Sequence, residues 1–239
     1  MFVLPTWNRP EKLEAFFAAA KETNMTSPGA VFLQGKDQLE KYEGVLKKLP
    51  SNWICFVGET NIGLVSATNW VISQFKNETW YGLLCDDMLP KTQNWDTKLI
   101  KLAKDWNFVS CWDDSVNAHW RATGIMVLGG RLARTTGFIL PPCCWHICGD
   151  DWWQVVGKSL SIWKVAADVA IESGMDREGS DADETQQSAH RDFSIELVKY
   201  HRWLSQYGAD VIERLRVMLQ AHGALSDSTV GKFVVSEAA

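Results

Sequence analysis

Short apolar runs alternate with amphipathic segments along the first two thirds of the chain, a pattern that predicts strands separated by helices. The apolar runs are long enough for buried strands and lie at residues 2–6, 30–34, 53–57, 80–85, 108–112 and 125–128. Apolar residues at helical spacing predict helices over residues 10–22, 37–48 and 61–75, with Asn61 as the N-cap of the third. This alternation is typical of an α/β fold with a mainly parallel sheet flanked by helices.

The last part of the chain has a different pattern, which becomes helical from Glu184 onward. The apolar residues that share one helix face there are Phe193, Leu197, Tyr200 and Leu204. Gly208 interrupts this pattern, and Asp210 is a suitable N-cap for a second helix. The polar segment before the helices, residues 175–185, is a candidate mobile lid. We therefore expect a main domain, a helical extension for packing or oligomer contact, and a weakly ordered tail, over residues 1–185, 186–222 and 223–239.

Length, composition and charge narrow the possible classes of function. A chain of 239 residues with 46% hydrophobic residues can bury one sizeable core. The net charge of −5, without a run of lysine or arginine, counts against an extended nucleic-acid surface. No apolar segment approaches the roughly 20 residues that span a bilayer, so no transmembrane segment is expected. Since Pro5 interrupts the first apolar run too early for a signal peptide, we expect a cytoplasmic protein.

The cysteine and tryptophan contents do not by themselves identify a site. The six cysteines are Cys55, Cys85, Cys111, Cys143, Cys144 and Cys148. The first three lie in apolar strand-like runs, where a thiol acts as a small hydrophobic side chain, and no export signal favours disulfide formation. The other three lack a second ligand pair at a spacing typical of zinc. The 13 tryptophans suit either a large core or platforms that stack against sugars.

Two adjacent carboxylates, Asp86 and Asp87, directly follow the strand predicted over residues 80–85. Like charges side by side oppose each other's ionisation, and a divalent cation removes that conflict. Carboxylate oxygens are ligands that Mg²⁺ and Mn²⁺ prefer. The dipeptide alone is equally consistent with a polar turn, in which aspartate is common.

Polar residues also follow the other predicted parallel strands, at residues 5–9, 34–37 and 58–61. Ligands of an open parallel sheet bind beyond the carboxyl ends of its strands, and these ends share one edge. There Arg9 can donate to a diphosphate, and Asp37 can accept a hydrogen bond from a base or a ribose hydroxyl. The shared edge therefore favours a metal–diphosphate site over a simple turn at Asp86 and Asp87.

Taken in order, these stretches resemble the nucleotide-sugar glycosyltransferases of the GT-A type, close to the large family 2. Residues 4–10 match the opening strand and loop, residues 61–69 match an N-x-G-x-x-x-A-x-N helix, and residues 84–87 match the acidic metal motif. Residues 123–126 match the acceptor-side strand, and residues 149–153 match the later acidic motif that opens a helix. The resemblance extends from about residue 2 to about residue 185. It implies a GT-A (Rossmann-like) fold with the helical extension appended.

The resemblance also implies a reaction and the residues that perform it. A sugar passes, with inversion, from a nucleotide-diphosphate donor, with a UDP-sugar as the expected donor, to a hydroxyl acceptor. The nucleotide pocket comprises Pro5, Thr6, Asn8, Arg9 and Asp37, and its wall is shaped by Asn61, Gly63 and Asn69. Mn²⁺ or Mg²⁺ on the diphosphate is held by Asp87 and Asp86, with Asp87 expected to dominate and Asp86 also able to contact the donor's sugar. The general base is Asp151 or Asp150, for which helix capping is the alternative role.

This chain departs from the family pattern in two ways. Its aspartates are adjacent, whereas the family motif is often D-x-D. The family's metal-binding histidine after the last strand is also missing, because residues 169–174 offer Glu172 and Ser173 instead. Glu172 is therefore the candidate for a further oxygen ligand.

Several assignments remain open from the sequence. Trp145, His146, Trp152 and Trp153 lie near the later acidic motif and either bind a sugar or belong to the core, and at least one of the tryptophans should be structural. His119 and Arg121 are candidates to contact the acceptor or a phosphate. The acceptor is a glycan, a lipid-linked sugar or a hydroxylated DNA base, and a homo-oligomer through the C-terminal helices is possible. The alternatives are a non-catalytic nucleotide-sugar-binding protein and a nucleotidyltransferase, which is disfavoured because no glycine-rich loop follows the first strand.

Overall fold

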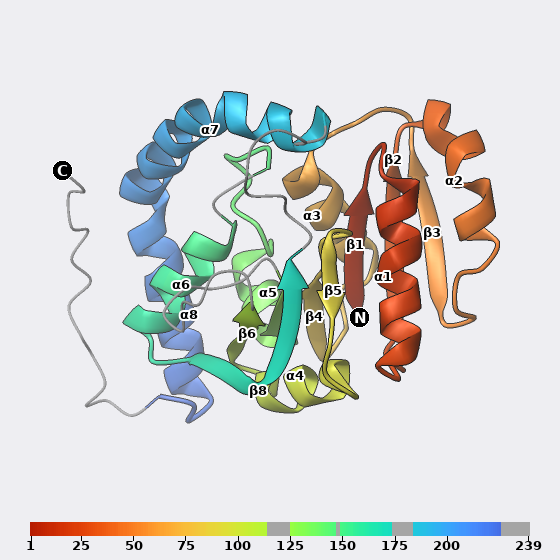
Figure 1. Cartoon of the computed structure of the whole chain (residues 1–239). Helices are drawn as coiled ribbons and strands as arrows, with labels where there is room; N and C mark the ends of the chain where they lie inside the picture. The colour runs from red at the N-terminus through yellow and green to blue at the C-terminus, as the bar shows by residue number, and fades with distance from the viewer. Residues whose placement is uncertain (114–124, 147–148, 174–183, 226–239) are drawn as a thin grey trace.

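The protein is built around one mixed sheet with helices on both faces (Figure 1). The computed structural model describes residues 1–113, 125–146, 149–173 and 184–225. Within these, the strands are β1 (Phe2–Thr6), β2 (Gly29–Gln34), β3 (Trp53–Gly58), β4 (Trp80–Leu83), β5 (Met88–Pro90), β6 (Phe108–Asp113), β7 (Met126–Gly129) and β8 (Trp163–Ser173). Their order across the sheet is β3-β2-β1-β4-β7-β6-β8-β5. The predicted α/β class is therefore confirmed.

Strand directions place most carboxyl ends at one edge of the sheet. Strand β1 pairs in parallel with β2 and β4, and β2 pairs in parallel with β3. Strand β7 is antiparallel to both β4 and β6, so β6 runs in the same direction as β4, and β8 is parallel to β6. Strand β5 is antiparallel to β8. The segments that follow β1, β2, β3 and β4 consequently leave the sheet at the same edge, as the sequence predicted.

Helices cover both faces of the sheet, and side chains that alternate along the strands enter two separate cores, whereas the edge strand β3 is partly exposed. In β1, Phe2 and Leu4 enter one core while Val3 enters the other. The first core is completed by α1 (Pro10–Glu22), α2 (Leu39–Leu46) and α4 (Trp95–Ala103). The second is completed by α3 (Leu64–Gln74), α5 (Gly130–Thr136), α6 (Gly149–Ser159), α7 (Glu184–Trp203) and α8 (Ala209–Ala221).

Two of the predicted helices begin differently in the structure. A 3₁₀ turn, η1 (Lys36–Gln38), precedes α2, so residues 37–48 do not form one continuous helix. Helix α3 begins at Leu64 with Gly63 as its N-cap, and the prediction of Asn61 in that role is wrong. The reason is the positive φ of Gly63 (80°), which is incompatible with a helix passing through it. The Asn61 Oδ1 instead accepts a hydrogen bond from the Gly63 N–H (2.9 Å) in the preceding turn.

The C-terminal helices are present, but Gly208 does not separate them. Residues Leu204–Gly208 form a π-helical turn, η2, between α7 and α8, and the chain stays helical while changing direction (Figure 1). Asp210 lies inside α8, so its prediction as an N-cap is wrong. Leu204 and Tyr200 are buried as predicted, whereas Phe193 is about half exposed. The division into a main domain and an extension, and oligomer contact through these helices, stay predictions.

Some sequence-based assignments fall outside the described residues. They are His119, Arg121, the start of the acceptor-side motif, Cys148, most of the candidate lid and the end of the tail. In the part of the chain that the structure describes, no helix is both long and apolar enough to cross a membrane. None of the cysteines described there forms a disulfide bond.

Candidate functional site

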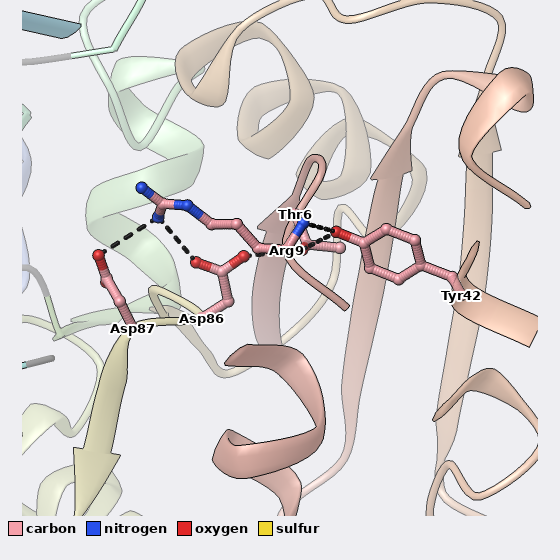
Figure 2. Close-up of polar contacts among 5 residues, drawn as sticks. All are labelled: Thr6, Arg9, Tyr42, Asp86 and Asp87. Carbon is pink, nitrogen blue, oxygen red and sulfur yellow. Dashed lines mark hydrogen bonds and ion pairs between the residues drawn. The ribbon is translucent and has the colours of Figure 1, made fainter. Parts of the chain in front are cut away.

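A buried cluster of ionisable side chains lies where β1 and β4 end, at the carboxyl edge of the sheet (Figure 2). The Arg9 Nη1 donates to Asp86 Oδ1 (3.2 Å) and to Asp87 Oδ2 (3.3 Å). All three residues are nearly excluded from solvent, with exposed fractions of 8% for Arg9, 5% for Asp86 and 9% for Asp87. One guanidinium nitrogen thus bridges both carboxylates, and the structure brings together three residues that the sequence assigned to one site.

A chain of hydrogen bonds through Thr6 and Tyr42 holds Asp86 in place. The Thr6 hydroxyl, at the end of β1, donates to Asp86 Oδ2 (2.7 Å). Because that uses its only hydrogen, the Tyr42 hydroxyl must donate to Thr6 Oγ1 (2.9 Å), and the same Tyr42 oxygen accepts from the Arg9 backbone N–H (2.7 Å). Figure 2 shows Tyr42 reaching from α2 to the start of this chain of bonds. Tyr42 therefore orients both Asp86 and the loop that carries Arg9.

Burial changes the acid–base properties of this cluster. Loss of solvation raises the pKa of Asp86 from an ordinary 3.8 to about 6, although the Arg9 charge opposes the shift. Burial also raises the pKa of the neighbouring Cys85 thiol well above its usual range, and the negative charges of Asp87, Asp86 and Asp150 contribute.

The raised pKa of Asp86 predicts that, without divalent metal, its contribution to stability increases on mild acidification. Since the folded state binds this proton more tightly than the unfolded state, the contribution rises as the pH falls from above 6 toward 4. We expect the wild type to gain stability over Asp86→Asn on acidification. The difference between their free energies of unfolding should be about 1 kcal/mol larger at pH 5 than at pH 7. Urea unfolding in a chelator measures it. The same stability difference at both pH values would contradict a raised pKa of Asp86. Asp210→Asn, at an exposed helix position, serves as the control.

The remaining residues assigned to the nucleotide pocket lie around this cluster. Pro5 is buried within β1, opposite Phe32. Asn8 follows with a positive φ of 56°, and its Oδ1 accepts a hydrogen bond from Lys41 Nζ (2.9 Å). Asp37 is exposed in η1, where its Oδ2 accepts from Gln38 Nε2 (2.7 Å). Asp37 is thus accessible at the end of β2.

Gly63 and Asn69, which the sequence assigned to the pocket wall, both contact the segment that follows α5. A Cβ atom at Gly63 would lie 2.6 Å from the Trp145 ring, so only glycine allows this close approach. The Asn69 Nδ2 donates to the Leu140 carbonyl (2.8 Å), and its Oδ1 accepts from the Ile139 and Leu140 N–H groups (3.0 and 3.2 Å). Asn69 therefore anchors the segment that follows α5, and its role in the wall of a nucleotide pocket stays a prediction.

The later acidic motif opens α6, as the sequence predicted. Asp150 and Asp151 are partly buried in its first turn, and the Asp151 N–H donates to Asp150 Oδ1 (3.0 Å). The next two residues, Trp152 and Trp153, are completely buried in the core, and Trp153 Nε1 donates to the Ile139 carbonyl. Both tryptophans are therefore structural, whereas Trp145 is 47% exposed and remains accessible to a ligand.

Glu172 does not join Asp86 and Asp87 in this structure. It lies on β8 opposite Leu89 and forms an ion pair with Lys91, with its side chain about half exposed. Among the described residues, no group of three or more histidine, cysteine, aspartate or glutamate side chains is arranged to hold a metal. Two carboxylates together with substrate phosphates are nevertheless a usual ligand set for Mg²⁺. Asp86 and Asp87 fit that set, since their hard oxygens converge on one cationic group.

Two residues near the site were not assigned to it from the sequence. Tyr42 supports Thr6 and Arg9, as described above. Glu196, on α7, is buried and accepts hydrogen bonds from the His146 N–H. The sequence signal that could have identified Glu196 is its place on the apolar face of α7, three residues after Phe193 and four before Tyr200, where a charged residue is unusual.

Known structures share this fold, although no protein-family model matches the chain and no curated protein has a significantly similar sequence. The mannosyltransferase PcManGT from Pyrobaculum calidifontis, in complex with GDP-Man and Mn²⁺, is similar at a TM-score of 0.61 and 14% identity, covering 95% of this chain and 76% of that one. GalNAc-T7 with UDP, GalNAc and Mn²⁺ gives 0.62 and 12%, covering 95% and 55%. Residues 1–349 of TarS from S. aureus, in complex with UDP, give 0.55 and 13%, covering 93% and 77%.

The chain thus spans about half the length of the GalNAc-T7 chain and about three quarters of PcManGT and of TarS residues 1–349. At these identities the likeness shows the fold alone. That fold is the GT-A fold of nucleotide-sugar glycosyltransferases, which the sequence resemblance implied.

Proposed function

We propose that this GT-A chain is a metal-dependent glycosyltransferase that moves a sugar from a nucleotide-diphosphate donor to a hydroxyl acceptor with inversion. The observation that carries the proposal is the buried Arg9–Asp86–Asp87 cluster at the carboxyl edge of the sheet. Burying two adjacent carboxylates is costly, and their retention beside a cation favours a role in binding charge. The position of this cluster also agrees with the general location of ligand sites in open α/β sheets, beyond the carboxyl ends of the strands.

The donor's diphosphate would be bound by Arg9 and by the metal held on Asp87 and Asp86. When bound, Mn²⁺ or Mg²⁺ supplies the positive charge that makes the nucleoside diphosphate a better leaving group. Arg9 can donate to phosphate oxygens with the same guanidinium that now bridges the carboxylates. Thr6 keeps Asp86 oriented, because its hydroxyl is itself fixed by Tyr42. Asp37 and Asn8 are proposed to contact the nucleoside.

An acid at the start of α6 would accept the proton of the acceptor hydroxyl. Asp150 and Asp151 are both partly buried there, and the electrostatic effect of Asp150 on Cys85 supports its nearness to the donor edge. A base at this position would allow direct attack on the anomeric carbon as the diphosphate leaves, which inverts the configuration. Glu172 is not proposed as a direct metal ligand, because its carboxylate is paired with Lys91.

The proposed donor is a UDP-sugar. Two of the similar structures, GalNAc-T7 and TarS, are complexes with UDP, whereas PcManGT is a complex with GDP-Man. The acceptor is proposed to be a hydroxyl of a glycan or a lipid-linked sugar. A hydroxylated base in duplex DNA is disfavoured by the net charge of −5.

Thermal unfolding with UDP- and GDP-sugars, each with and without Mn²⁺, tests the proposal. A donor at about 100 times its Kd stabilises the folded state by about 2.7 kcal/mol, so we expect the Tm to rise by about 5 °C or more with one donor. The rise should require Mn²⁺. Release of the nucleoside diphosphate, measured with that donor, then separates turnover from binding.

The outcomes of this test are distinct. Binding without release of nucleoside diphosphate, across acceptors of the three classes, would show a non-catalytic sugar-nucleotide-binding protein. No stabilisation by any donor with Mn²⁺ would contradict the proposal. Free UMP and inorganic phosphate with Mn²⁺ serve as matched controls, since neither carries the diphosphate bridge.

A further inference from the structure

The C-terminal helix α7 is joined to the loop after α5 through a buried carboxylate. The His146 backbone N–H donates to both Glu196 oxygens, Oε1 at 3.1 Å and Oε2 at 3.0 Å. Glu196 is only 3% exposed, although it lies on a helix whose flanking residues Ile195 and Val198 are exposed. A buried carboxylate is costly unless it is hydrogen-bonded, so this contact fixes the loop relative to the helix.

The same loop is joined on its other side to the start of α3. The Trp145 carbonyl, one residue before His146, accepts a hydrogen bond from the Val65 N–H (3.1 Å) in the first turn of that helix. The Trp145 ring packs on Gly63 so closely that a Cβ atom there would lie 2.6 Å away. The turn that includes Asn61 and Gly63 is therefore covered and held by this loop.

The loop also lies within electrostatic reach of the acidic cluster. Burial is the main cause of the lowered pKa of His146, and the positive charge of Arg9 contributes to it. The negative charges of Glu196 and Asp87 act in the opposite direction. Helix α7 crosses the molecule above the edge at which β1 and β8 end (Figure 1).

We infer that Glu196 is a positioning residue for the donor site, acting from the C-terminal helix through Trp145 and His146. The inference rests on the proposed function, and it deepens that function by making the helical extension part of the donor site. Glu196 contacts the loop, the loop contacts the N-terminus of α3, and α3 carries the wall of the nucleotide pocket. A small displacement of that wall weakens donor binding more than it changes the chemical step.

Replacing Glu196 by alanine tests the inference with two independent readouts. We expect hydrogen exchange at the His146 and Val65 amides to become about tenfold faster or more, because His146 loses its acceptor and the Trp145 carbonyl, which accepts from Val65, is no longer held in place by the neighbouring residue. We expect the KM for the donor, with Mn²⁺, to rise on the order of tenfold, with kcat changed by less than about threefold. Glu196→Gln keeps one acceptor oxygen and should give an intermediate result in both measurements. A merely structural role would lower kcat through the folded fraction and leave KM unchanged.

The matched control is Glu213→Ala, since Glu213 is an exposed glutamate on α8 that pairs with Arg216. It should change neither amide exchange nor KM. If Glu196→Ala does not fold, Glu196→Gln carries the test with a rise in KM of a few fold. An unchanged Val65 exchange rate and an unchanged donor KM in the folded variant would overturn the inference. Because exchange is measured without donor, failure of the wild type to bind any donor would reject the proposed function separately.

Discussion

Replacing Asp87 by alanine is expected to reduce donor turnover by about 10²–10³-fold, the largest loss that we expect from one side chain. Asp87 uses one oxygen, Oδ2, to contact Arg9. Asp86, in contrast, has both oxygens engaged, one by Arg9 and one by Thr6. Asp87 is therefore the better placed to give an oxygen to a divalent cation. Steady-state release of nucleoside diphosphate over a range of Mn²⁺ concentrations measures the loss.

The two aspartates should differ in a second property. Asp86→Ala is expected to lower both turnover and the free energy of unfolding, because it leaves the buried Thr6 hydroxyl without its carboxylate acceptor and removes one of the two carboxylates that Arg9 contacts. Asp87→Ala should mainly lower turnover and its stimulation by Mn²⁺. Asp210→Ala, an exposed position on α8, should be close to the wild type in both. Wild-type turnover in Asp87→Ala at saturating donor would exclude Asp87 from the site.

The first half of the fold could be predicted because local signals agree there with the final structure. Strand β1 and helix α1 begin and end where the sequence predicted them, since the apolar run is buried on both faces and Pro10 lies at the helix start. The start of α3 could not be predicted as well. An asparagine before a helical pattern is typical of an N-cap, and only the backbone angle of Gly63 shows that the helix begins later. The π-helical turn that ends at Gly208 could not be predicted either, because a glycine in a helical pattern indicates a break; there a Cβ atom would lie 2.6 Å from Leu204.

The candidate site was partly predictable for a similar reason. Parallel topology alone brings Arg9, Asp86 and Asp87 to one edge, so their proximity followed from the order of strands. Tyr42 was not recognised, because on an amphipathic helix a tyrosine at a buried position indicates core, and its hydroxyl's partner depends on how α2 packs against β1. The bond between Glu196 and His146 joins segments 50 residues apart, a distance over which periodicity carries no information.

Replacing Arg9 by methionine should reveal whether the guanidinium lies where a divalent cation would bind. Without metal, the variant leaves two buried carboxylates lacking their shared cation, and we expect a loss of about 3–5 kcal/mol in the free energy of unfolding. Added Mn²⁺ should then raise the Tm of Arg9→Met more than that of the wild type, because in the wild type Arg9 already neutralises Asp86 and Asp87. Thermal unfolding with Mn²⁺ and no donor measures this difference without reference to activity.

Arg9→Lys is the matched control, since it retains the positive charge as a single ammonium group in place of a planar fork. It should lie between the wild type and Arg9→Met in both stability and the response to Mn²⁺. An equal Mn²⁺ response in all three proteins would contradict a shared position for the guanidinium and the metal. A larger response in Arg9→Met that disappears when Asp87→Ala is added would assign the effect to the carboxylate pair. The same guanidinium would then be released toward the diphosphate whenever metal binds, which couples the two parts of the donor site.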